Sequence, residues 1–255
     1  MSGLDFAGRS GLITGAASGI GAACARWLDD HGIAELILVD RDEELLDALD
    51  LSCQTRRVAG DVSDPDLWSE FESEIGRLDH AVVNAGIADG CPIVDQSFSG
   101  WRHMLSVNLD GAFLALRAAL RVMKREATGK SIVMTSSVAG IKPQPMTAAY
   151  GSSKAAVAHL ARIAAAEHAK DGIRVNAVAP GRVDTPIWTK TAQFQLLQEE
   201  LGSREAALAQ LAEESTPLGR FATAEEMAGQ IGFLLSDEAW NITGTVMVSD
   251  GGYSL

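Results

Sequence analysis

Cysteine is scarce in this sequence, with only three residues in a chain of 255. Cys24, Cys53 and Cys91 are odd in number and far apart, so they match neither a disulfide framework nor a metal-ligand pattern. We therefore expect no metal site. We also expect a reducing compartment, with the cytoplasm as the default location.

Basic residues and long apolar runs are also in short supply. Lys and Arg number 21 against 34 Asp and Glu, which gives a net charge of −13. Such a chain has no general attraction for nucleic acids or anionic membranes. No apolar run approaches the ~20 residues of a membrane-spanning helix, and the start Met-Ser-Gly-Leu-Asp lacks the basic residues of a signal peptide. We expect neither nucleic acid nor a membrane among its partners.

The sequence does contain a regular alternation of short apolar runs and longer helical patterns, with 47% hydrophobic residues to fill a sizeable core. Strands are predicted at residues 10–14, 36–39, 57–59, 81–83, 131–135, 175–179 and 246–248. Helices are predicted at 22–31, 43–49, 65–75, 101–127 and from 150 to 170. This alternation predicts an α/β fold, a doubly wound parallel sheet of about seven strands with helices on both faces. No linker or repeat interrupts it, so residues 1–255 are expected to form a single domain.

A glycine-rich loop follows the first predicted strand directly. Gly15, Gly19 and Gly21 lie between that strand and a helix, the context in which a backbone loop and a helix N-terminus hold a phosphate group. The spacing is G-x-x-x-G-x-G, which differs from the common G-x-G-x-x-G dinucleotide fingerprint. A tight turn without a ligand is the plainer alternative.

The second predicted strand ends on Asp40, about 20 residues beyond the loop, where a carboxylate accepts hydrogen bonds from the adenosine ribose. A carboxylate there repels a 2′-phosphate, and Ser18 occupies a position where a cation would read that phosphate. Arg41 follows directly and leaves some ambiguity. The alternative is that Asp40 caps the next helix. We interpret the pattern as favouring NAD over NADP.

Tyr150 and Lys154 are four residues apart at the start of a predicted helix, so both side chains lie on one face. A phenol titrates near pH ~10, too high for a base at neutral pH. A cation ~4 Å away contributes at most about 4 kcal/mol at an effective dielectric of ~20, or roughly three pKa units. The pair is therefore expected to lower the pKa of Tyr150 enough for proton exchange. A surface Tyr beside a solvated Lys is the alternative.

Polar residues and turn residues collect where predicted strands end: Gly15, Asp40, Asp61, Asn84, Ser137 and Pro180. Because right-handed crossovers bring the carboxyl ends of parallel strands to one edge, these residues are expected to meet there. Ligands bind at that edge in open α/β sheets. The sequence thus predicts one site that includes the glycine loop and Tyr150.

In this order and spacing, the motifs resemble those of the short-chain dehydrogenase/reductase family over essentially the whole chain. The family's T-G-x-x-x-G-x-G loop matches residues 14–21, and its D-V and N-A-G motifs match Asp61-Val62 and Asn84-Ala85-Gly86. Its active-site Asn, Ser and Y-x-x-x-K match Asn108, Ser137, Tyr150 and Lys154, and its P-G and T-P pairs match Pro180-Gly181 and Thr185-Pro186. Ser136 is the alternative to Ser137, which has the family's interval to Tyr150. Val83 stands where many members carry a second Asn.

The resemblance implies a Rossmann-type fold in which Tyr150 exchanges a proton with the substrate oxygen and Lys154 lowers its pKa. Ser137 is implied to polarise that oxygen, and Asn108 to support a water in a proton relay. The residues implied to bind the cofactor are Gly15, Ser18, Gly19, Ile20, Gly21, Asp40, Arg41, Asp61, Val62, Asn84, Ala85, Gly86, Tyr150, Lys154, Pro180, Gly181, Val183 and Thr185. Asn108 as an ordinary helix residue and Thr185 as a simple cap are the plainer alternatives.

The family resemblance also implies a homotetramer and a substrate lid at about 187–215, where the strand–helix rhythm is lost. The candidate lining segments 90–94, 139–146 and 187–194 are mostly apolar, although Lys142 and Lys190 could approach. We therefore expect an NAD-dependent oxidoreductase that acts on a neutral, largely apolar secondary alcohol or ketone. The alternatives are an NADPH-dependent ketoreductase of the 3-oxoacyl type and, more remotely, a non-catalytic dinucleotide-binding protein. Trp188, Phe194 and Trp240 are more typical of core or interface aromatics than of substrate contacts.

Overall fold

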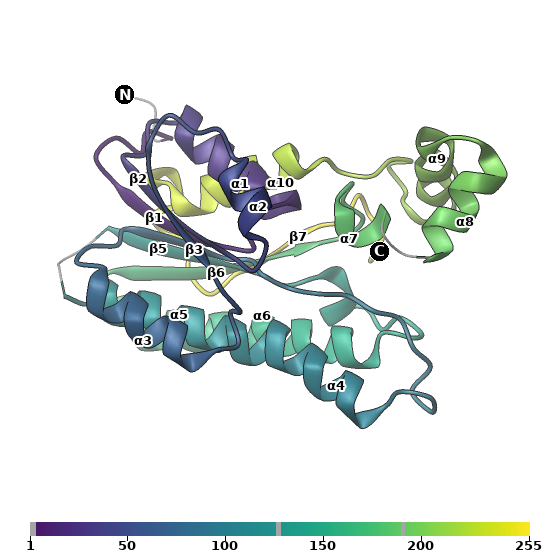
Figure 1. Ribbon diagram of the computed structural model, residues 1–255, viewed down its shortest axis with the longest axis horizontal. Helices are drawn as coiled ribbons and strands as arrows, with labels where there is room; N and C mark the ends of the chain where they lie inside the picture. The colour runs from purple at the N-terminus through teal and green to yellow at the C-terminus, as the bar shows by residue number, and fades with distance from the viewer. Residues whose placement is uncertain (1–3, 126–128, 190–191) are drawn as a thin grey trace.

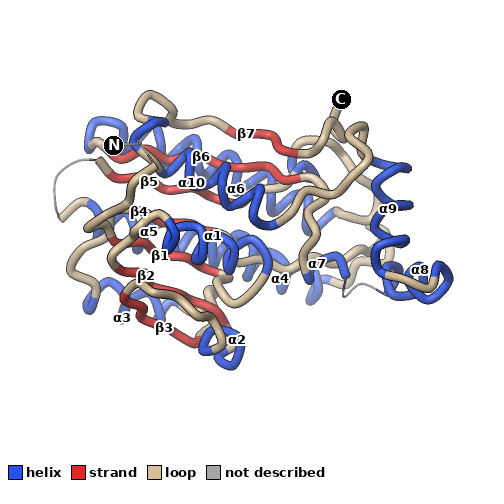
Figure 2. Tube along the Cα trace, turned by 90° about the horizontal axis from the view of Figure 1, so that it is seen from above, coloured by secondary structure: helices blue, strands red, loops and turns tan. Residues whose placement is uncertain are grey.

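The computed structural model describes residues 4–125, 129–189 and 192–255. Its centre is a seven-stranded sheet in the order β3-β2-β1-β4-β5-β6-β7, which can be followed from above in Figure 2. The strands are β1 (Ser10–Thr14), β2 (Glu35–Asp40), β3 (Gln54–Ala59), β4 (His80–Val83), β5 (Lys130–Thr135), β6 (Ile173–Pro180) and β7 (Val246–Ser249). The predicted strands are therefore all present, most of them a residue or more longer than expected.

All neighbouring strands of this sheet pair in parallel, from Ser10 opposite Glu35 in β1–β2 to Pro180 opposite Ser249 in β6–β7. The chain winds outward from β1 to β3 on one side and returns to start β4 on the other. The order of strands reverses between β1 and β4, and crevices at such a reversal bind ligands. The doubly wound fold predicted from the sequence is confirmed.

One face of the sheet is covered by α1 (Gly19–Asp30), α2 (Glu43–Asp47) and α10 (Ala224–Leu235), as Figure 1 shows. Their apolar side chains pack on alternate strand residues, for example Leu28 and Ile231 on Ile13 and Leu38. We did not predict α10 from the sequence. The capping box of Thr223 and Glu226 that begins it is the signal that could have found it.

The other face is covered by α3 (Pro65–Glu74), α4 (Phe98–Leu105), α5 (Gly111–Met123) and α6 (Ala148–His168). The single helix predicted at 101–127 is wrong, because a π-helical turn at Ser106–Asp110 separates α4 from α5 and α5 ends at Met123. The proline-free sequence gave no sign of this interruption. The last residues of that prediction, 126–127, lie outside the described residues.

After β6 the chain leaves the sheet and forms α7 (Pro186–Thr189), α8 (Ala192–Leu201) and α9 (Arg204–Ser215), and α8 and α9 project from one end of the molecule in Figure 1. This is the segment in which the sequence loses its strand–helix rhythm. Short 3-10 turns lie at Val138–Gly140, Ala169–Asp171 and Asp237–Ala239. Among the described residues, no helix combines the length and apolar character that a membrane span requires.

Candidate active site

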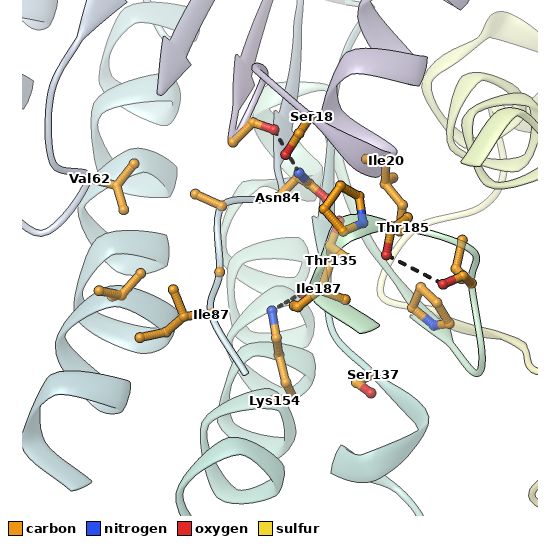
Figure 3. A pocket seen from close by; sticks show the side chains of 18 of the residues that line it. Ser18, Ile20, Val62, Asn84, Ile87, Thr135, Ser137, Lys154, Thr185 and Ile187 are labelled. Carbon is orange, nitrogen blue, oxygen red and sulfur yellow. Dashed lines mark hydrogen bonds between the residues drawn. The ribbon is translucent and has the colours of Figure 1, made fainter. Parts of the chain in front are cut away.

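A pocket of about 280 Å³ opens at the carboxyl ends of the strands, where the sequence predicted a site. Figure 3 shows side chains from several elements around it, with Ser18 and Asn84 at one end and Ser137 and Lys154 at the other. The predicted residues that line it are Gly15, Ser18, Gly19, Ile20, Asp40, Arg41, Asp61, Val62, Asn84, Ala85, Gly86, Ser137, Tyr150, Lys154, Pro180, Gly181, Val183 and Thr185. The predicted residues outside this lining are Gly21 and Asn108.

The glycine loop is shaped by close backbone contacts. Gly15 has φ +66° and faces the next strand end so closely that a Cβ would lie 2.8 Å from the Ala85 Cα. A Cβ on Gly21 would lie 2.0 Å from the Gly15 carbonyl oxygen. Gly21 therefore lets the start of α1 pack closely against the loop at Gly15. This close contact requires a glycine at position 21, although the residue does not line the pocket.

The N-terminus of α1 faces the same pocket. Ser18 is its N-cap, and among the described residues its side chain makes no capping hydrogen bond. The first-turn amides of Gly19 and Ile20 lie at the pocket wall, where an anion would meet free N–H groups and the positive end of the helix dipole. The loop thus has the open cradle and the donors that a dinucleotide pyrophosphate requires.

Asp40 is held at the end of β2 by two backbone amides. Its Oδ2 accepts from the Ala17 N–H at 3.0 Å, and its Oδ1 accepts from the Asp42 N–H at 3.1 Å. Asp42, whose carboxylate accepts from Leu45 N–H at 3.1 Å, caps α2. The alternative that Asp40 caps this helix is therefore wrong, and the Asp40 carboxylate is directed to the glycine loop and the pocket.

The same end of the pocket carries a second carboxylate, Asp61, at the turn after β3. Hydrogen bonds from the Ser63 amide and hydroxyl hold the pKa of Asp61 below its ordinary value, with smaller contributions from the charges of Arg41 and His103. Arg41 and His103 both line the pocket. This end therefore combines two carboxylates with basic groups, so the charge pattern here is mixed rather than purely acidic.

The opposite end of the pocket holds Ser137, Tyr150 and Lys154. Tyr150 lies in the first turn of α6, and Ser137 follows β5 and hydrogen-bonds its phenol. The Lys154 Nζ donates to the Thr135 carbonyl oxygen at 2.9 Å and lies 5.9 Å from the centroid of the Tyr150 ring. The three side chains therefore converge from two elements, as predicted.

The effect of Lys154 on the pKa of Tyr150 stays a prediction. Burial raises the pKa of Tyr150 above its ordinary value, and the hydrogen bond with Ser137 opposes that rise. Burial also lowers the pKa of Lys154 to about 8. The Lys154 ammonium is directed to the Thr135 carbonyl oxygen, and desolvation is the largest influence on the pKa of the phenol.

Ser136, the alternative to Ser137, is engaged elsewhere: its hydroxyl donates to the Lys154 carbonyl oxygen at 2.7 Å and is buried. Ser136 therefore fastens the end of β5 to α6. The Ser137 hydroxyl accepts from the Ala139 N–H at 3.2 Å and retains its proton for another partner. The geometry supports the choice of Ser137.

Asn108 lies in the π-helical turn and is fully buried. Its Oδ1 accepts from the Ile87 N–H at 2.8 Å, and its Nδ2 donates to the Ile87 carbonyl oxygen at 2.9 Å and lies 3.2 Å from the Ser153 Oγ. It thus connects the loop after β4 to α6 behind Tyr150. The proposed relay water stays a prediction.

Sequence reasoning missed five residues of the pocket lining: Gly60, Ile87, His103, Val107 and Thr135. Ile187 and Trp188 come from the predicted lining segment 187–194, whereas the segments 90–94 and 139–146 do not contribute to this pocket. Thr135 and Ile87 could have been found, since both follow the rule that ligands lie at strand ends.

Lys142 donates to the Tyr253 carbonyl oxygen at 2.7 Å. Phe194 is buried and Trp240 is exposed, while Lys190 lies outside the described residues.

Comparison with known proteins agrees with this arrangement. A family model described as enoyl-(acyl carrier protein) reductase matches residues 15–254. A cis-4-hydroxycyclohexanecarboxylate dehydrogenase of Sinomonas cyclohexanicum is 38% identical over 98% of both chains. A 3-oxoacyl-[acyl-carrier-protein] reductase of Thermotoga maritima is 38% identical over 96% of this chain and 97% of its own. The crystal structure of L-sorbose reductase from Gluconobacter frateurii, complexed with NADPH and L-sorbose, superposes with a TM-score of 0.91 at 28% identity, covering 98% of both chains.

A doubly wound domain with a pocket where the strand order reverses between β1 and β4 is typical of the Rossmann-type class of dinucleotide-binding folds. Within that class the chain belongs to the short-chain dehydrogenase/reductase family. Members of this family bind a nicotinamide cofactor, NAD or NADP.

Proposed function

We propose that the protein is an NAD-dependent oxidoreductase that interconverts a secondary alcohol and its ketone. The observation that supports this most directly is the shared pocket. Ser137, Tyr150 and Lys154 lie at one end of it, and the glycine loop and Asp40 lie at the other. A nicotinamide dinucleotide would span the two ends, with its adenosine at Asp40 and its nicotinamide ring beside Tyr150.

Each residue at the chemical end has a task in this proposal. The nicotinamide cofactor supplies or accepts the hydride. The Tyr150 phenol, neutral because burial raises its pKa, gives its proton to the carbonyl oxygen when a ketone is reduced and takes it back when an alcohol is oxidised. Ser137 donates a hydrogen bond to the same oxygen and orients it. The Lys154 ammonium, held by Thr135, places a positive charge beside the phenolate that forms.

The carboxylate of Asp40 supports NAD as the preferred cofactor. It accepts two backbone hydrogen bonds, and each oxygen keeps a lone pair for a ribose hydroxyl. The NADPH-dependent 3-oxoacyl type of reductase stays the alternative, since Arg41 lies at the same end of the pocket and the L-sorbose reductase structure contains NADPH. Asp40 would repel the 2′-phosphate of that cofactor.

Substitution Asp40→Ala is expected to weaken NAD use roughly 10- to 100-fold, because a hydrogen bond to a charged group contributes about 1.5–3 kcal/mol. NADP use should rise or stay constant, since a repulsive charge is removed. The measurement is kcat/KM for NAD and NADP with one alcohol. Asp42→Ala is the matched control: it removes a neighbouring carboxylate that caps α2 and should leave the cofactor ratio unchanged. An unchanged ratio in Asp40→Ala contradicts the assignment.

The substrate that we propose is a neutral, largely apolar secondary alcohol or ketone. The pocket lining includes the apolar residues Ile87, Ile187 and Trp188. Lys142, a cation within the predicted lining segment 139–146, donates a hydrogen bond to the Tyr253 carbonyl oxygen. The relative from Sinomonas is named for a ring alcohol that bears a carboxylate, so an acidic ring alcohol is the alternative that a test must include.

The test is the absorbance of the reduced nicotinamide with a panel of neutral secondary alcohols and cis-4-hydroxycyclohexanecarboxylate, with NAD and NADP in parallel. Turnover of neutral alcohols with NAD supports the proposal. Turnover of the carboxylate alone overturns the neutral substrate, and turnover with NADP alone moves the protein to the reductase alternative. Cofactor binding without turnover across a broad panel favours the non-catalytic alternative.

Three further features belong to the proposal. The segment α7–α9 acts as a lid that closes over the substrate. The chain assembles as a homotetramer through faces of α5 and α6 on which Phe113 and Ile163 are exposed, and light scattering that gives a monomer at micromolar concentration contradicts this. The cytoplasm is proposed as its location on the scarcity of cysteine.

A further inference from the structure

The Arg182 guanidinium lies among three aromatic rings beside the pocket. Its carbon is 4.8 Å from the centroid of the Trp188 ring, 5.7 Å from that of Phe221 and 5.9 Å from that of Tyr253. Trp188 and Phe221 also meet edge to face, with centroids 6.4 Å apart. Cations at such distances from aromatic faces are attracted by the ring quadrupole. We call these four residues the Arg182 cluster.

The three rings come from separate parts of the chain. Trp188 belongs to α7, Phe221 lies on the segment that returns from α9, and Tyr253 is near the C-terminus. The return segment is fastened at the same place, because the Ala222 N–H donates to the Arg182 carbonyl oxygen and the Asp184 N–H donates to the Ala222 carbonyl oxygen, both at 2.9 Å. Arg182 therefore joins both ends of the segment that we propose as a lid.

The C-terminal turn is itself well fixed. The Asp250 carboxylate accepts from the amides of Gly252 and Ser254, at 2.9 and 2.8 Å. Lys142 donates to the Tyr253 carbonyl oxygen at 2.7 Å, and its ammonium lies 4.8 Å from the centroid of the Tyr253 ring. The Tyr253 ring thus contacts two cations, Lys142 from the loop after β5 and Arg182 from the segment after β6. Figure 1 places the C-terminus and α7 at the same end of the molecule.

The pocket residues beside the cluster give it a functional consequence. Gly181 and Val183 flank Arg182 in sequence, and both line the pocket, as do Ile187 and the Trp188 ring. The loop that carries Lys142 begins directly after Ser137 and the turn Val138–Gly140. A shift of the cluster therefore moves the apolar wall against which a substrate would rest, while the glycine loop and Asp40 lie at the other end of the pocket.

We propose that Arg182 and Tyr253 are positioning residues that hold α7 and the loop after Ser137 as the substrate wall of the pocket. This inference rests on the proposed function in so far as the wall is assigned to substrate. The cluster acts through Trp188 and Ile187, which line the pocket. Its loss should weaken substrate affinity more than cofactor affinity, since the neighbouring Val183 and Thr185 are among the predicted cofactor-binding residues.

The experiment compares Tyr253→Ala with Tyr253→Phe, and Arg182→Met with Arg182→Lys. The first member of each pair removes the ring or the charge, and the second keeps it. Trp240→Ala is the control, because this exposed aromatic is remote from the pocket lining. Three quantities are measured: KM for an alcohol from the panel, the NAD dissociation constant by calorimetry, and amide hydrogen exchange of residues 182–188.

We expect Tyr253→Ala to raise KM roughly tenfold, since two cation–π contacts are lost, with kcat within twofold of the wild type and a smaller rise in the NAD dissociation constant. Exchange at 182–188 should increase, and Tyr253→Phe and Arg182→Lys should restore all three quantities. Unchanged exchange and KM in Tyr253→Ala and Arg182→Met overturn the inference. So does an increase in exchange that is uniform over the chain, or one that Tyr253→Phe fails to restore.

The two proposals fail in different ways. If no alcohol turns over with either cofactor, the proposed function fails. The exchange comparison still decides whether the Tyr253 ring and the Arg182 charge hold α7 in place. If alcohols turn over and the Ala and Phe variants of Tyr253 behave alike in KM and in exchange, the proposed function stands and the Arg182 cluster has no positioning role.

Discussion

Substitution Tyr150→Phe is expected to lower kcat/KM by about 10²–10⁴-fold, the usual contribution of a positioned general acid or base. The change removes only the phenolic oxygen, which hydrogen-bonds Ser137 at the chemical end of the pocket. The ring stays in α6, so the NAD dissociation constant should change little. Steady-state rates in both directions and calorimetric titration with NAD provide the measurement.

The chain supplies its own matched control for this experiment. It contains two tyrosines, and Tyr253 is the other. Tyr253→Phe removes the same oxygen from a ring that contacts Arg182 and Lys142 through its π face. Full activity in Tyr150→Phe, or an equal loss in both variants, contradicts the assignment of Tyr150 as the proton-exchanging residue.

The raised pKa of Tyr150 adds a direction to this prediction. Below that pKa the phenol is protonated and ready to donate, which suits ketone reduction. Alcohol oxidation needs a proton acceptor, and the fraction of phenolate increases as the pH rises toward that pKa. The oxidation rate of the wild type should therefore rise through the alkaline range. The residual rate of Tyr150→Phe should lack this rise.

Much of the site could be predicted because it depends on topology alone. Residues such as Gly15, Asp40 and Ser137 follow strands, and in a parallel sheet all strand ends of one sense meet at one edge. No knowledge of side-chain packing was needed to bring them together. The i to i+4 spacing of Tyr150 and Lys154 was equally local, and the helix begins at Ala148, two residues before the predicted start.

The parts that escaped prediction depend on burial and on local helix geometry. The π-helical turn around Asn108 has no proline or glycine inside it to mark it, and it directs the amide to the Ile87 backbone. The pKa of Tyr150 could not be derived from spacing, because the deciding factor is how far the phenol is removed from water. Trp188 and Tyr253 are far apart in sequence and meet only through the fold around Arg182.

Another buried titratable group lies at the amino ends of the strands, away from the pocket at their carboxyl ends. His80 begins β4 and is fully buried, with its Nδ1 2.9 Å from the Ser131 Oγ and its Nε2 3.4 Å from the Arg9 Nη1. Arginine can only donate, so this network assigns Nε2 as the acceptor and Nδ1 as the protonated nitrogen. The Ser131 hydroxyl in turn donates to the Leu235 carbonyl oxygen at 2.7 Å. A second proton on the ring would face the Arg9 guanidinium.

Burial, with a smaller contribution from the charge of Arg9, lowers the pKa of His80 to about 3 from its ordinary 6.5. Between these two values the unfolded chain binds a proton at His80 and the folded chain does not. The free energy of unfolding must then fall as the pH falls below 6.5, by about 1.4 kcal/mol for each pH unit. The hydrogen bond with Arg9 lowers the pKa of the nearby Asp237. Burial acts to raise the pKa of Asp79, but the hydrogen bond from the Ser10 amide helps to bring it below its ordinary value. Their contribution is lost only below pH ~4, where carboxylates of the unfolded chain protonate.

The window between pH 7 and pH 5 therefore isolates His80. We expect the wild type to lose about 2 kcal/mol of unfolding free energy across it, measured by urea denaturation at several pH values. His80→Gln replaces the ring by a neutral amide, so the variant should be less stable at pH 7 and lose much less of its stability on going to pH 5. His159→Gln, at an exposed position on α6, is the control and should follow the wild type. An equal pH dependence in His80→Gln and the wild type would show that His80 is not the group whose protonation opposes folding, and that the network around Arg9 tolerates a charged imidazole.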